Sequence, residues 1–239
     1  MPSPGLDGAG VHIVGRVARL DLERELRTGI PEMVLAEGKR DADLREVALA
    51  MAGSKGRAVV TRLDSDRVAL LRAPGLDVAY HAEARVAVVG KVGTLPVPRN
   101  GGTVGILAAG TSDLPVCEEA RVVAEEMGCE TATAYDVGVA GLQRLEAGLR
   151  ETAGADVLVV AAGREGALPT VVSGLVPQPV IGLPVSTGYG MGGKGEAALL
   201  SMLQACSPIL VVNIDAGFVA GACAARIAAR IAEGRKHGR

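Results

Sequence analysis

Five short runs of β-branched and small apolar residues recur through the second half of the chain, and segments with helical spacing separate them. Between two of these runs, Leu142, Leu145 and Leu149 recur at intervals of three and four residues, which is typical of an amphipathic helix. Apolar strands joined by helical crossovers form parallel sheets with helices on both faces. We therefore predict a doubly wound, three-layer, flavodoxin-like α/β domain, with strands at residues 103–108, 130–135, 156–162, 179–185 and 209–214.

Residues 94–102 contain two prolines and two glycines between two apolar runs, a pattern typical of a domain boundary. We place the boundary there, and predict a small α+β domain at residues 1–98 and the α/β domain at residues 99–239. In the first domain, residues 16–28 are charged and amphipathic, residues 42–52 are predicted to form a helix, and residues 56–62 and 84–89 are predicted to form strands.

The charge balance and the aromatic content argue against nucleic acid as a partner. Lysine and arginine total 25 against 27 acidic residues, so the chain has no basic field that would neutralise a phosphate backbone. Aromatic residues make up 2% of the chain, which leaves few platforms on which bases could stack.

The apolar runs and the cysteines favour a cytoplasmic protein with no membrane partner. The patch Val11–Val14 is too short for a signal-peptide core, and Asn213, Asp215 and Arg226 interrupt the longest apolar region, residues 209–232. The four cysteines show no Cys-x-x-Cys pairing and none of the density of a disulfide scaffold, which fits a reducing compartment.

In an open parallel sheet, ligands bind outside the carboxyl ends of the strands, so the loops there are the candidate site. The loop after the first strand contains Gly110, Thr111, Ser112 and Asp113, in which a glycine, two hydroxyls and a carboxylate could cradle a phosphate. The alternative is that Ser112 or Asp113 only caps the helix that begins near Leu114.

The next two loops each offer one carboxylate close to a glycine, Asp136 with Gly138 and Glu165 with Gly166. As a general acid or base, Glu165 would need partial desolvation to bring its pKa towards the working pH. A solvated or helix-capping carboxylate is the alternative.

The fourth loop, residues 186–195, holds five glycines in ten residues and ends where a helix begins. Gly188, Tyr189 and Gly190 could belong to a mobile lid or an anion cradle, and Lys194 could contact a phosphate. The loop is not the common phosphate-binding motif because no hydroxyl follows the lysine, and it could be a plain flexible connector. After the fifth strand, Asn213 and Asp215 are easier to explain as ligand contacts than as core residues.

Cys206 lies after the helix at residues 195–205 and just before the fifth strand, at the sheet edge opposite these loops. A helix C-terminus disfavours a thiolate, and none of His12, His81 and His237 is placed to activate the thiol. The pattern alone therefore predicts that Cys206 is a buried small apolar residue.

The same stretches resemble the LarB family, the pyridinium-3,5-biscarboxylic acid mononucleotide synthases of nickel-pincer cofactor biosynthesis, whose C-terminal domain is similar to the purine-pathway enzyme PurE. In the second domain the matching stretches are Ala109–Val116, Asp136–Leu142, Glu165–Pro169, Gly188–Gly190, Leu203–Cys206 and Val212–Asp215. In the first domain they are Leu26–Glu32, Glu37–Lys39, Thr61–Arg62 and Glu83–Arg85. The chain departs from the family pattern at Gln143, usually histidine, and at residues 191–194, Ala216 and Val219.

The resemblance implies an enzyme that carboxylates the pyridinium ring of nicotinic acid adenine dinucleotide with carbon dioxide and cleaves the phosphoanhydride to release AMP. It implies that Cys206 is the nucleophile, because a thiolate that adds to the ring makes an enamine able to attack carbon dioxide. Glu165 would remove the ring proton. Magnesium would offset the diphosphate charge, with Asp113, Asp136 or Asp215 nearby.

Two alternative functions remain open. A PurE-type aminoimidazole ribonucleotide carboxylase or mutase is disfavoured because Tyr135 and Asp136 stand in place of its His-Arg pair, and the stretch Gly166–Pro169 lacks its histidine. A non-catalytic nucleotide-binding module would have no use for Cys206. The conflict between Cys206 and the sheet-edge rule, together with the octamers of PurE-like domains, leads us to expect a homo-oligomer, an octamer, with shared active sites.

Overall fold

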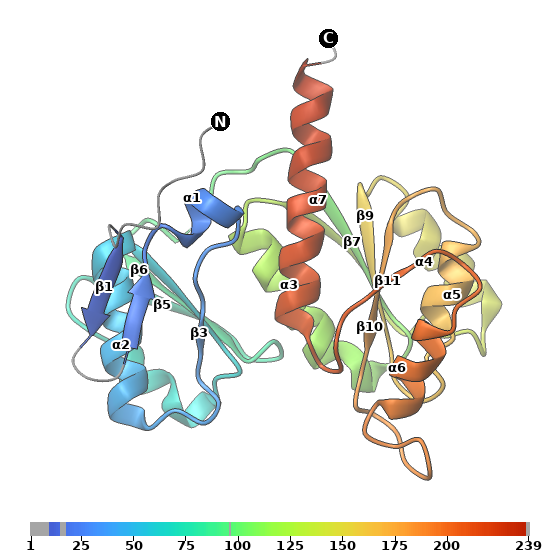
Figure 1. Cartoon of the computed structure of the whole chain (residues 1–239), viewed down its shortest axis with the longest axis horizontal. Coiled ribbons are helices and arrows are strands. Elements are labelled where there is room, and N and C mark those ends of the chain that lie inside the picture. The colour runs from blue at the N-terminus through green and yellow to red at the C-terminus, as the bar shows by residue number, and fades with distance from the viewer. Residues whose placement is uncertain (1–9, 15–17, 96, 238–239) are drawn as a thin grey trace. The chain divides into compact units, whose positions relative to one another are not determined.

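The computed structural model describes residues 10–14, 18–95 and 97–237, and the chain divides into two compact units, Met1–Val97 and Pro98–Arg239. Each unit contains its own buried apolar cluster. Figure 1 shows the helices and strands of both units.

The second unit is built on a five-stranded sheet in which every neighbouring pair of strands is parallel. Its strands are β7 (Thr103–Ala108), β8 (Glu130–Ala134), β9 (Val157–Ala162), β10 (Val180–Pro184) and β11 (Leu210–Val211). They lie in the order β11-β10-β9-β7-β8. The chain adds β8 on one side of β7 and all later strands on its other side, so the strand order reverses between β7 and β9. The predicted doubly wound α/β fold is confirmed, although β11 is shorter than predicted.

Helices cover both faces of this sheet (Figure 1). They are α3 (Leu114–Glu126), α4 (Leu142–Glu151), α5 (Leu168–Ser173), α6 (Glu196–Leu203) and α7 (Gly217–His237), with a short 3₁₀ helix, η2, at Thr111–Asp113. Alternate residues of each strand point to opposite faces, so β9 sends Val157, Val159 and Ala161 towards α3 and α7. Leu158 and Val160 of the same strand pack with α4, α5 and α6.

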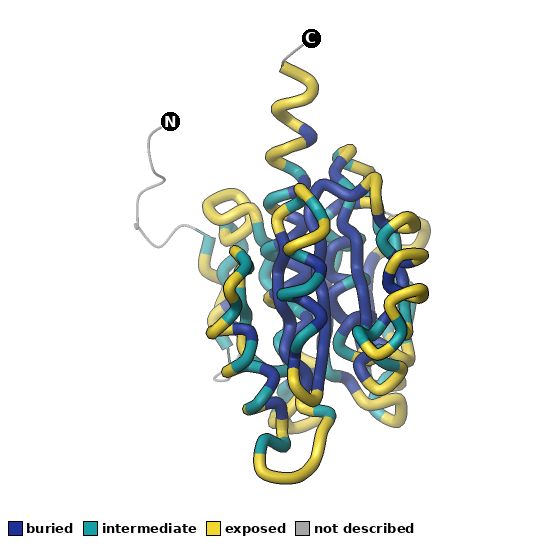
Figure 2. The backbone as a smooth tube through the Cα atoms, turned by 90° about the vertical axis from the view of Figure 1, so that its right-hand side faces the viewer, coloured by how far each residue is buried: buried dark blue, intermediate teal, exposed yellow. Residues whose placement is uncertain are grey.

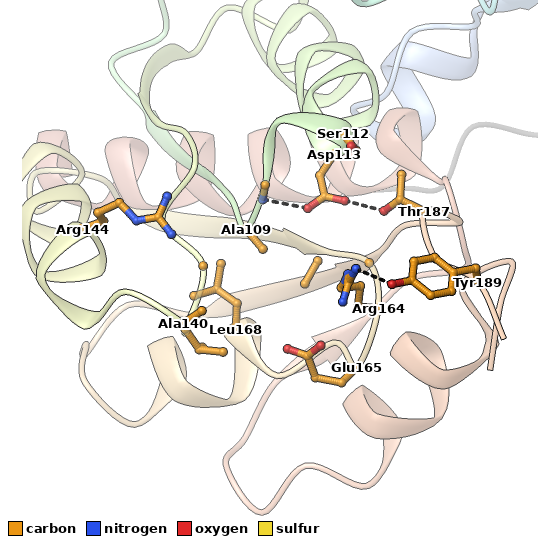
Figure 3. Close-up of a pocket in the computed structure, with 16 residues that line it drawn as sticks. Ala109, Ser112, Asp113, Ala140, Arg144, Arg164, Glu165, Leu168, Thr187 and Tyr189 are labelled. Carbon is orange, nitrogen blue, oxygen red and sulfur yellow. Dashed lines mark hydrogen bonds between the residues drawn. The ribbon is translucent and has the colours of Figure 1, made fainter. Parts of the chain in front are cut away.

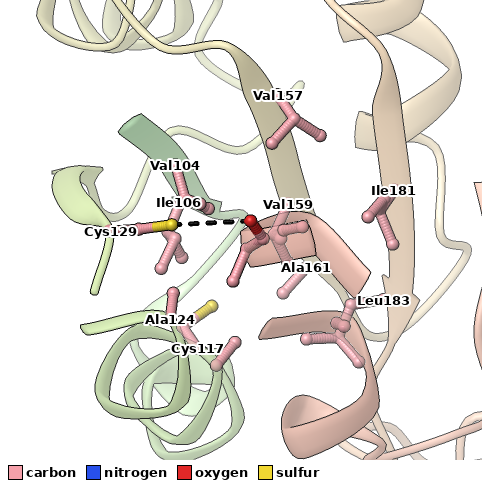
Figure 4. Packing of buried hydrophobic residues seen from close by; sticks show 14 of the residues in the cluster. Val104, Ile106, Cys117, Ala124, Cys129, Val157, Val159, Ala161, Ile181 and Leu183 are labelled. Carbon is pink, nitrogen blue, oxygen red and sulfur yellow. Dashed lines mark hydrogen bonds between the residues drawn. The ribbon is translucent and has the colours of Figure 1, made fainter. Parts of the chain in front are cut away.

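The core under α3 and α7 is made almost wholly of valine, isoleucine, leucine and alanine (Figure 4). Two cysteines are part of it, and the Cys129 thiol lies 3.6 Å from the carbonyl oxygen of Ala225. Figure 2 shows the central strands buried and the outer faces of the helices exposed. The sheet is therefore a rigid base for the loops that leave its strands.

The first unit is an α+β fold, as predicted. One sheet has the order β3-β4-β6-β5 and a second pairs β1 with β2. Its elements are β1 (Val11–Val14), β2 (Ala18–Asp21), α1 (Arg24–Thr28), β3 (Val34–Leu35), α2 (Asp41–Lys55), β4 (Arg57–Thr61), the 3₁₀ helix η1 (Ser65–Leu71), β5 (Leu76–His81) and β6 (Val86–Lys91). Helix α2 and strands β4 and β6 correspond to predicted elements. Residues 16 and 17 of the charged stretch lie outside the described residues.

No helix within the described residues is both long enough and apolar enough to span a bilayer.

Candidate active site

A cavity of about 460 Å³ lies at the carboxyl ends of the strands of the parallel sheet, where the strand order reverses between β7 and β9. Loops after β7, β8, β9 and β10 supply its walls (Figure 3). Ligands bind at this point in doubly wound folds, since neighbouring loops diverge there and leave a crevice. The lining residues are Ala109, Gly110, Ser112, Asp113, Gly138, Val139, Ala140, Arg144, Ala162, Gly163, Arg164, Glu165, Leu168, Thr187, Gly188 and Tyr189.

Asp113 is the buried polar centre of the cavity wall, with 4% of its surface exposed. Its Oδ2 accepts a hydrogen bond of 3.0 Å from the backbone of Gly110, and its Oδ1 accepts one of 2.7 Å from Thr187 Oγ1. The backbone of Gly163 donates to it as well. Burial raises the pKa of Asp113, and the hydrogen bonds from Thr187, Gly110 and Gly163 lower it in part. One carboxylate thus ties together the loops after β7, β9 and β10.

Two glycines permit this close approach of loops. A Cβ on Gly163 would lie 2.0 Å from Thr187 Oγ1, and a Cβ on Gly138 would lie 2.7 Å from the carbonyl oxygen of Ala109. Because both neighbours belong to the same cavity wall, a larger side chain at either position would push the loops apart.

The loop after β9 presents Arg164 and Glu165 on the side of the cavity that Tyr189 borders (Figure 3). The guanidinium carbon of Arg164 lies 5.2 Å from the centre of the Tyr189 ring, and Arg164 Nη2 donates a hydrogen bond of 3.2 Å to the phenol oxygen. Glu165 is exposed, so the single chain does not supply the desolvation that a general base at this position would need.

Arg144 enters the cavity from the opposite side in Figure 3. It belongs to α4 and forms an ion pair with Asp136 of the loop after β8; about half of each side chain is exposed, 49% and 53%. Water screens such a pair, so the ion pair orients the guanidinium more than it stabilises the fold.

Comparison with known proteins places both units of the chain. Residues 103–237, more than half of the chain, match the AIR carboxylase family, and residues 12–91 match the LarB/PurE-like N-terminal domain. The chain belongs to the LarB family.

Individual relatives match this chain over most of its length or over about half of it. An uncharacterized protein of Methanocaldococcus jannaschii is 42% identical over 88% of this chain and 83% of its own length. The N5-carboxyaminoimidazole ribonucleotide mutases of Pyrococcus horikoshii and Thermotoga maritima are 33% and 30% identical, over 52% of this chain and 71% and 73% of theirs. These matches put the LarB-family chain in a carboxylase- and mutase-type group of enzymes.

The cavity of this LarB-family chain brings together about half of the side chains and glycines singled out from the sequence. Gly110, Ser112, Asp113, Gly138, Glu165, Gly188 and Tyr189 line it. Thr111, Asp136, Gly166, Gly190, Lys194, Asn213 and Asp215 do not line it. Of these, Asp136 acts on the cavity through Arg144, and Asp215 Oδ1 accepts a hydrogen bond of 2.8 Å from the backbone of Ser186. Lys194 is exposed on the glycine-rich loop, and the Asn213 side chain accepts a hydrogen bond from the backbone of Ile214.

The prediction that Cys206 is buried is wrong, because the thiol is exposed. Cys206 lies in a turn between the end of α6 and β11, and β11 is an edge strand of two residues, which leaves little structure to cover the turn. It does not line the cavity that contains Glu165. Glu165 follows the end of β9, and Cys206 precedes the start of β11. Because the strands are parallel, Glu165 lies at the carboxyl ends of the strands and Cys206 lies at their amino ends, on the opposite side of the sheet.

The carboxylates suggested for magnesium do not form a site made of protein ligands alone. Both oxygens of Asp113 accept hydrogen bonds, Asp136 is paired with Arg144, and Asp215 holds the backbone of Ser186. No group of three or more acidic, histidine or cysteine residues in the described parts of the chain is arranged to hold a metal ion. Magnesium would therefore depend on substrate phosphates and water for most of its ligands.

Sequence reasoning missed Arg144, Arg164 and Thr187, which all line the cavity. Arg164 and Thr187 stand directly beside residues that were singled out, so reading each whole loop would have found them. Arg144 follows the helix start at Leu142, and its direction depends on how the loop after β8 folds back.

Proposed function

We propose that this chain converts nicotinic acid adenine dinucleotide, carbon dioxide and water to pyridinium-3,5-biscarboxylic acid mononucleotide and AMP. The observation that carries the proposal is that a carboxylate, Glu165, lines the cavity at the point where the strand order reverses, in a chain that contains both LarB-family domains. Asp113 makes one wall of the cavity polar, and Gly138 and Gly163 leave the backbone of the wall accessible to a ligand. Both features suit a nucleotide, because its ribose and phosphate need backbone donors and close contact.

In the proposed reaction, the Cys206 thiolate adds to the electron-poor pyridinium ring, and the ring nitrogen accepts the electron pair. The resulting enamine carbon attacks carbon dioxide and forms the new carbon–carbon bond. Glu165 then takes the proton from that carbon, the ring regains aromaticity, and the thiolate leaves. Water cleaves the phosphoanhydride bond to release AMP. Magnesium, bound mainly by diphosphate oxygens, would neutralise charge on the leaving phosphate.

In this scheme the exposed Cys206 must come from a second subunit, because within one chain it lies at the amino ends of the strands and Glu165 lies at their carboxyl ends. We propose a homo-oligomer, an octamer, in which the β11 edge of one chain faces the cavity of its neighbour. Leu203 and Leu210 are more than half exposed on either side of Cys206, as expected for residues that a neighbouring chain covers.

Incubation with the dinucleotide, bicarbonate and magnesium, followed by chromatography for AMP and the biscarboxylated product, tests the proposal. We expect both products from the wild-type protein and no biscarboxylated product from a Cys206→Ala variant. Aminoimidazole ribonucleotide, tested in parallel, should not be carboxylated. Turnover of aminoimidazole ribonucleotide instead would establish the PurE-type alternative, and binding without any product would establish a non-catalytic module.

A further inference from the structure

Two guanidinium groups enter the candidate cavity from opposite sides, with the buried Asp113 on the wall between them (Figure 3). Arg144 comes from α4 and Arg164 from the loop after β9. A cavity with a cation at each end favours a ligand that carries two separated anionic groups, since each guanidinium can form paired hydrogen bonds with a carboxylate or a phosphate.

Asp136 orients the guanidinium of Arg144 and occupies only part of its hydrogen-bonding capacity. Its Nη1 contacts Asp136, and the remaining nitrogen–hydrogen donors are the ones that a ligand could use. Asp136 itself has a left-handed backbone, with a φ of 57°. Aspartate is one of the few residue types other than glycine that adopt this conformation readily, and here it lies in the loop after β8 within ion-pair distance of Arg144.

Arg164 is oriented in a different way. Its backbone φ is 46°, its guanidinium lies over the ring of Tyr189, and only Nη2 has a hydrogen bond to the phenol oxygen. The aromatic face restricts the plane of the guanidinium, which prepares its other donors for a flat anion. Arg164 also precedes Glu165 directly, so a group bound to this arginine lies beside the proposed base.

We infer that the cavity selects the mononucleotide half of the substrate by its two charges: Arg164 binds the carboxylate of the pyridinium ring, and Arg144 binds the phosphate. The inference rests on the proposed function. The direction follows from Glu165, which has to reach the ring and therefore places the ring at the Arg164 end. The ribose phosphate, at the other end of the ligand, then reaches Arg144 across the cavity.

Binding of three ligands tests the inference by titration calorimetry: nicotinic acid mononucleotide, nicotinic acid riboside, which lacks the phosphate, and nicotinamide mononucleotide, which lacks the carboxylate. An Arg144→Ala variant should bind the mononucleotide about ten- to a hundredfold more weakly and bind the riboside as the wild type does. An Arg164→Ala variant should lose a similar factor for nicotinic acid mononucleotide and keep the wild-type affinity for nicotinamide mononucleotide.

Arg150→Ala is the matched control, because Arg150 lies on the same helix as Arg144, pairs with Glu146 and does not line the cavity. It should leave all three affinities unchanged. If an alanine variant fails to fold, the lysine variant at that position, Arg144→Lys or Arg164→Lys, keeps the charge and should show a smaller loss with the same ligand preference.

Equal loss for the mononucleotide and the riboside in the Arg144 variant would overturn the assignment of the phosphate, as would equal loss for both mononucleotides in the Arg164 variant. Because these titrations measure no turnover, their failure is distinct from failure of the proposed reaction. A protein that binds with the expected preferences and yet makes no product contradicts the proposed function alone.

Discussion

Thr187 Oγ1 donates a hydrogen bond of 2.7 Å to Oδ1 of Asp113, and this contact joins the loop after β10 to the loop after β7 across the reversal point of the sheet. The Asp113 carboxylate is nearly inaccessible to water. Its position within the wall makes it a group that shapes the cavity and whose ionisation is coupled to folding.

The first prediction concerns the pH dependence of stability. Burial raises the pKa of Asp113, so the unfolded chain releases this proton at a lower pH than the folded chain does. The stability that Asp113 contributes is therefore complete below its unfolded pKa of about 3.9 and is lost as the pH rises through the folded value. The free energy of unfolding of the wild type, relative to an Asp113→Asn variant, should therefore fall as the pH rises above about 4.

Urea unfolding of both proteins at several pH values measures this difference. Subtracting the variant removes the contribution of acidic groups that do not interact with position 113, so the difference reports mainly on the Asp113 carboxyl. A difference that is constant with pH, or that rises, would show that the folded pKa of Asp113 is not raised.

The second prediction concerns the contact of α7 with α3. A Cβ on Gly221 would lie 2.4 Å from the carbonyl oxygen of Ala120, whereas a Cβ on Gly234, near the end of the same helix, would meet nothing within 4 Å. Gly221→Ala should lower the free energy of unfolding by about 1–3 kcal/mol because the helices must separate. Gly234→Ala should leave it unchanged or raise it by up to about 1 kcal/mol, the helix preference for alanine. Similar losses in both variants, measured by urea unfolding, would contradict the close approach.

The loops at the carboxyl ends of the strands could be predicted from the sequence because continuous apolar runs such as β9 form the buried strands of a parallel sheet. Once the strands are located, the segment after each one is the candidate loop. The direction of side chains within those loops could not. Arg144 reaches the cavity because the loop after β8 packs closely against the loop after β7, at Gly138 and Ala109. Cys206 was misplaced since its burial depends on β11, and two residues at a sheet edge cover little.

The small unit was predicted less completely for a related reason. Strand β5 is partly buried at every position and carries Asp77 and His81, so its pattern does not alternate as that of a half-buried strand does. Its pairing with β6, along the whole of both strands, places it in the sheet. Tertiary pairing of this kind overrides local sequence preference.

The third prediction concerns the thiols. Burial raises the pKa of both Cys117 and Cys129, so each stays protonated and unreactive, while Cys206 is exposed. Iodoacetamide should label Cys206 far faster than Cys117 or Cys129, as read by peptide mass spectrometry. Nicotinic acid adenine dinucleotide should slow labelling of Cys206. Labelling of Cys206 that the dinucleotide leaves unchanged would count against a role at the active site.

The fourth prediction tests the central claim, that Glu165 and Cys206 of different subunits serve one carboxylation site. Glu165→Gln and Cys206→Ala should each be inactive alone, since one lacks the base and the other the nucleophile. In oligomers mixed at equal ratio, about a quarter of the sites receive both intact groups if each site spans two subunits. We therefore expect product formation to return to about a quarter of the wild-type rate. Mixed oligomers that native mass spectrometry shows to have formed, yet that stay as inactive as either parent, would contradict the account.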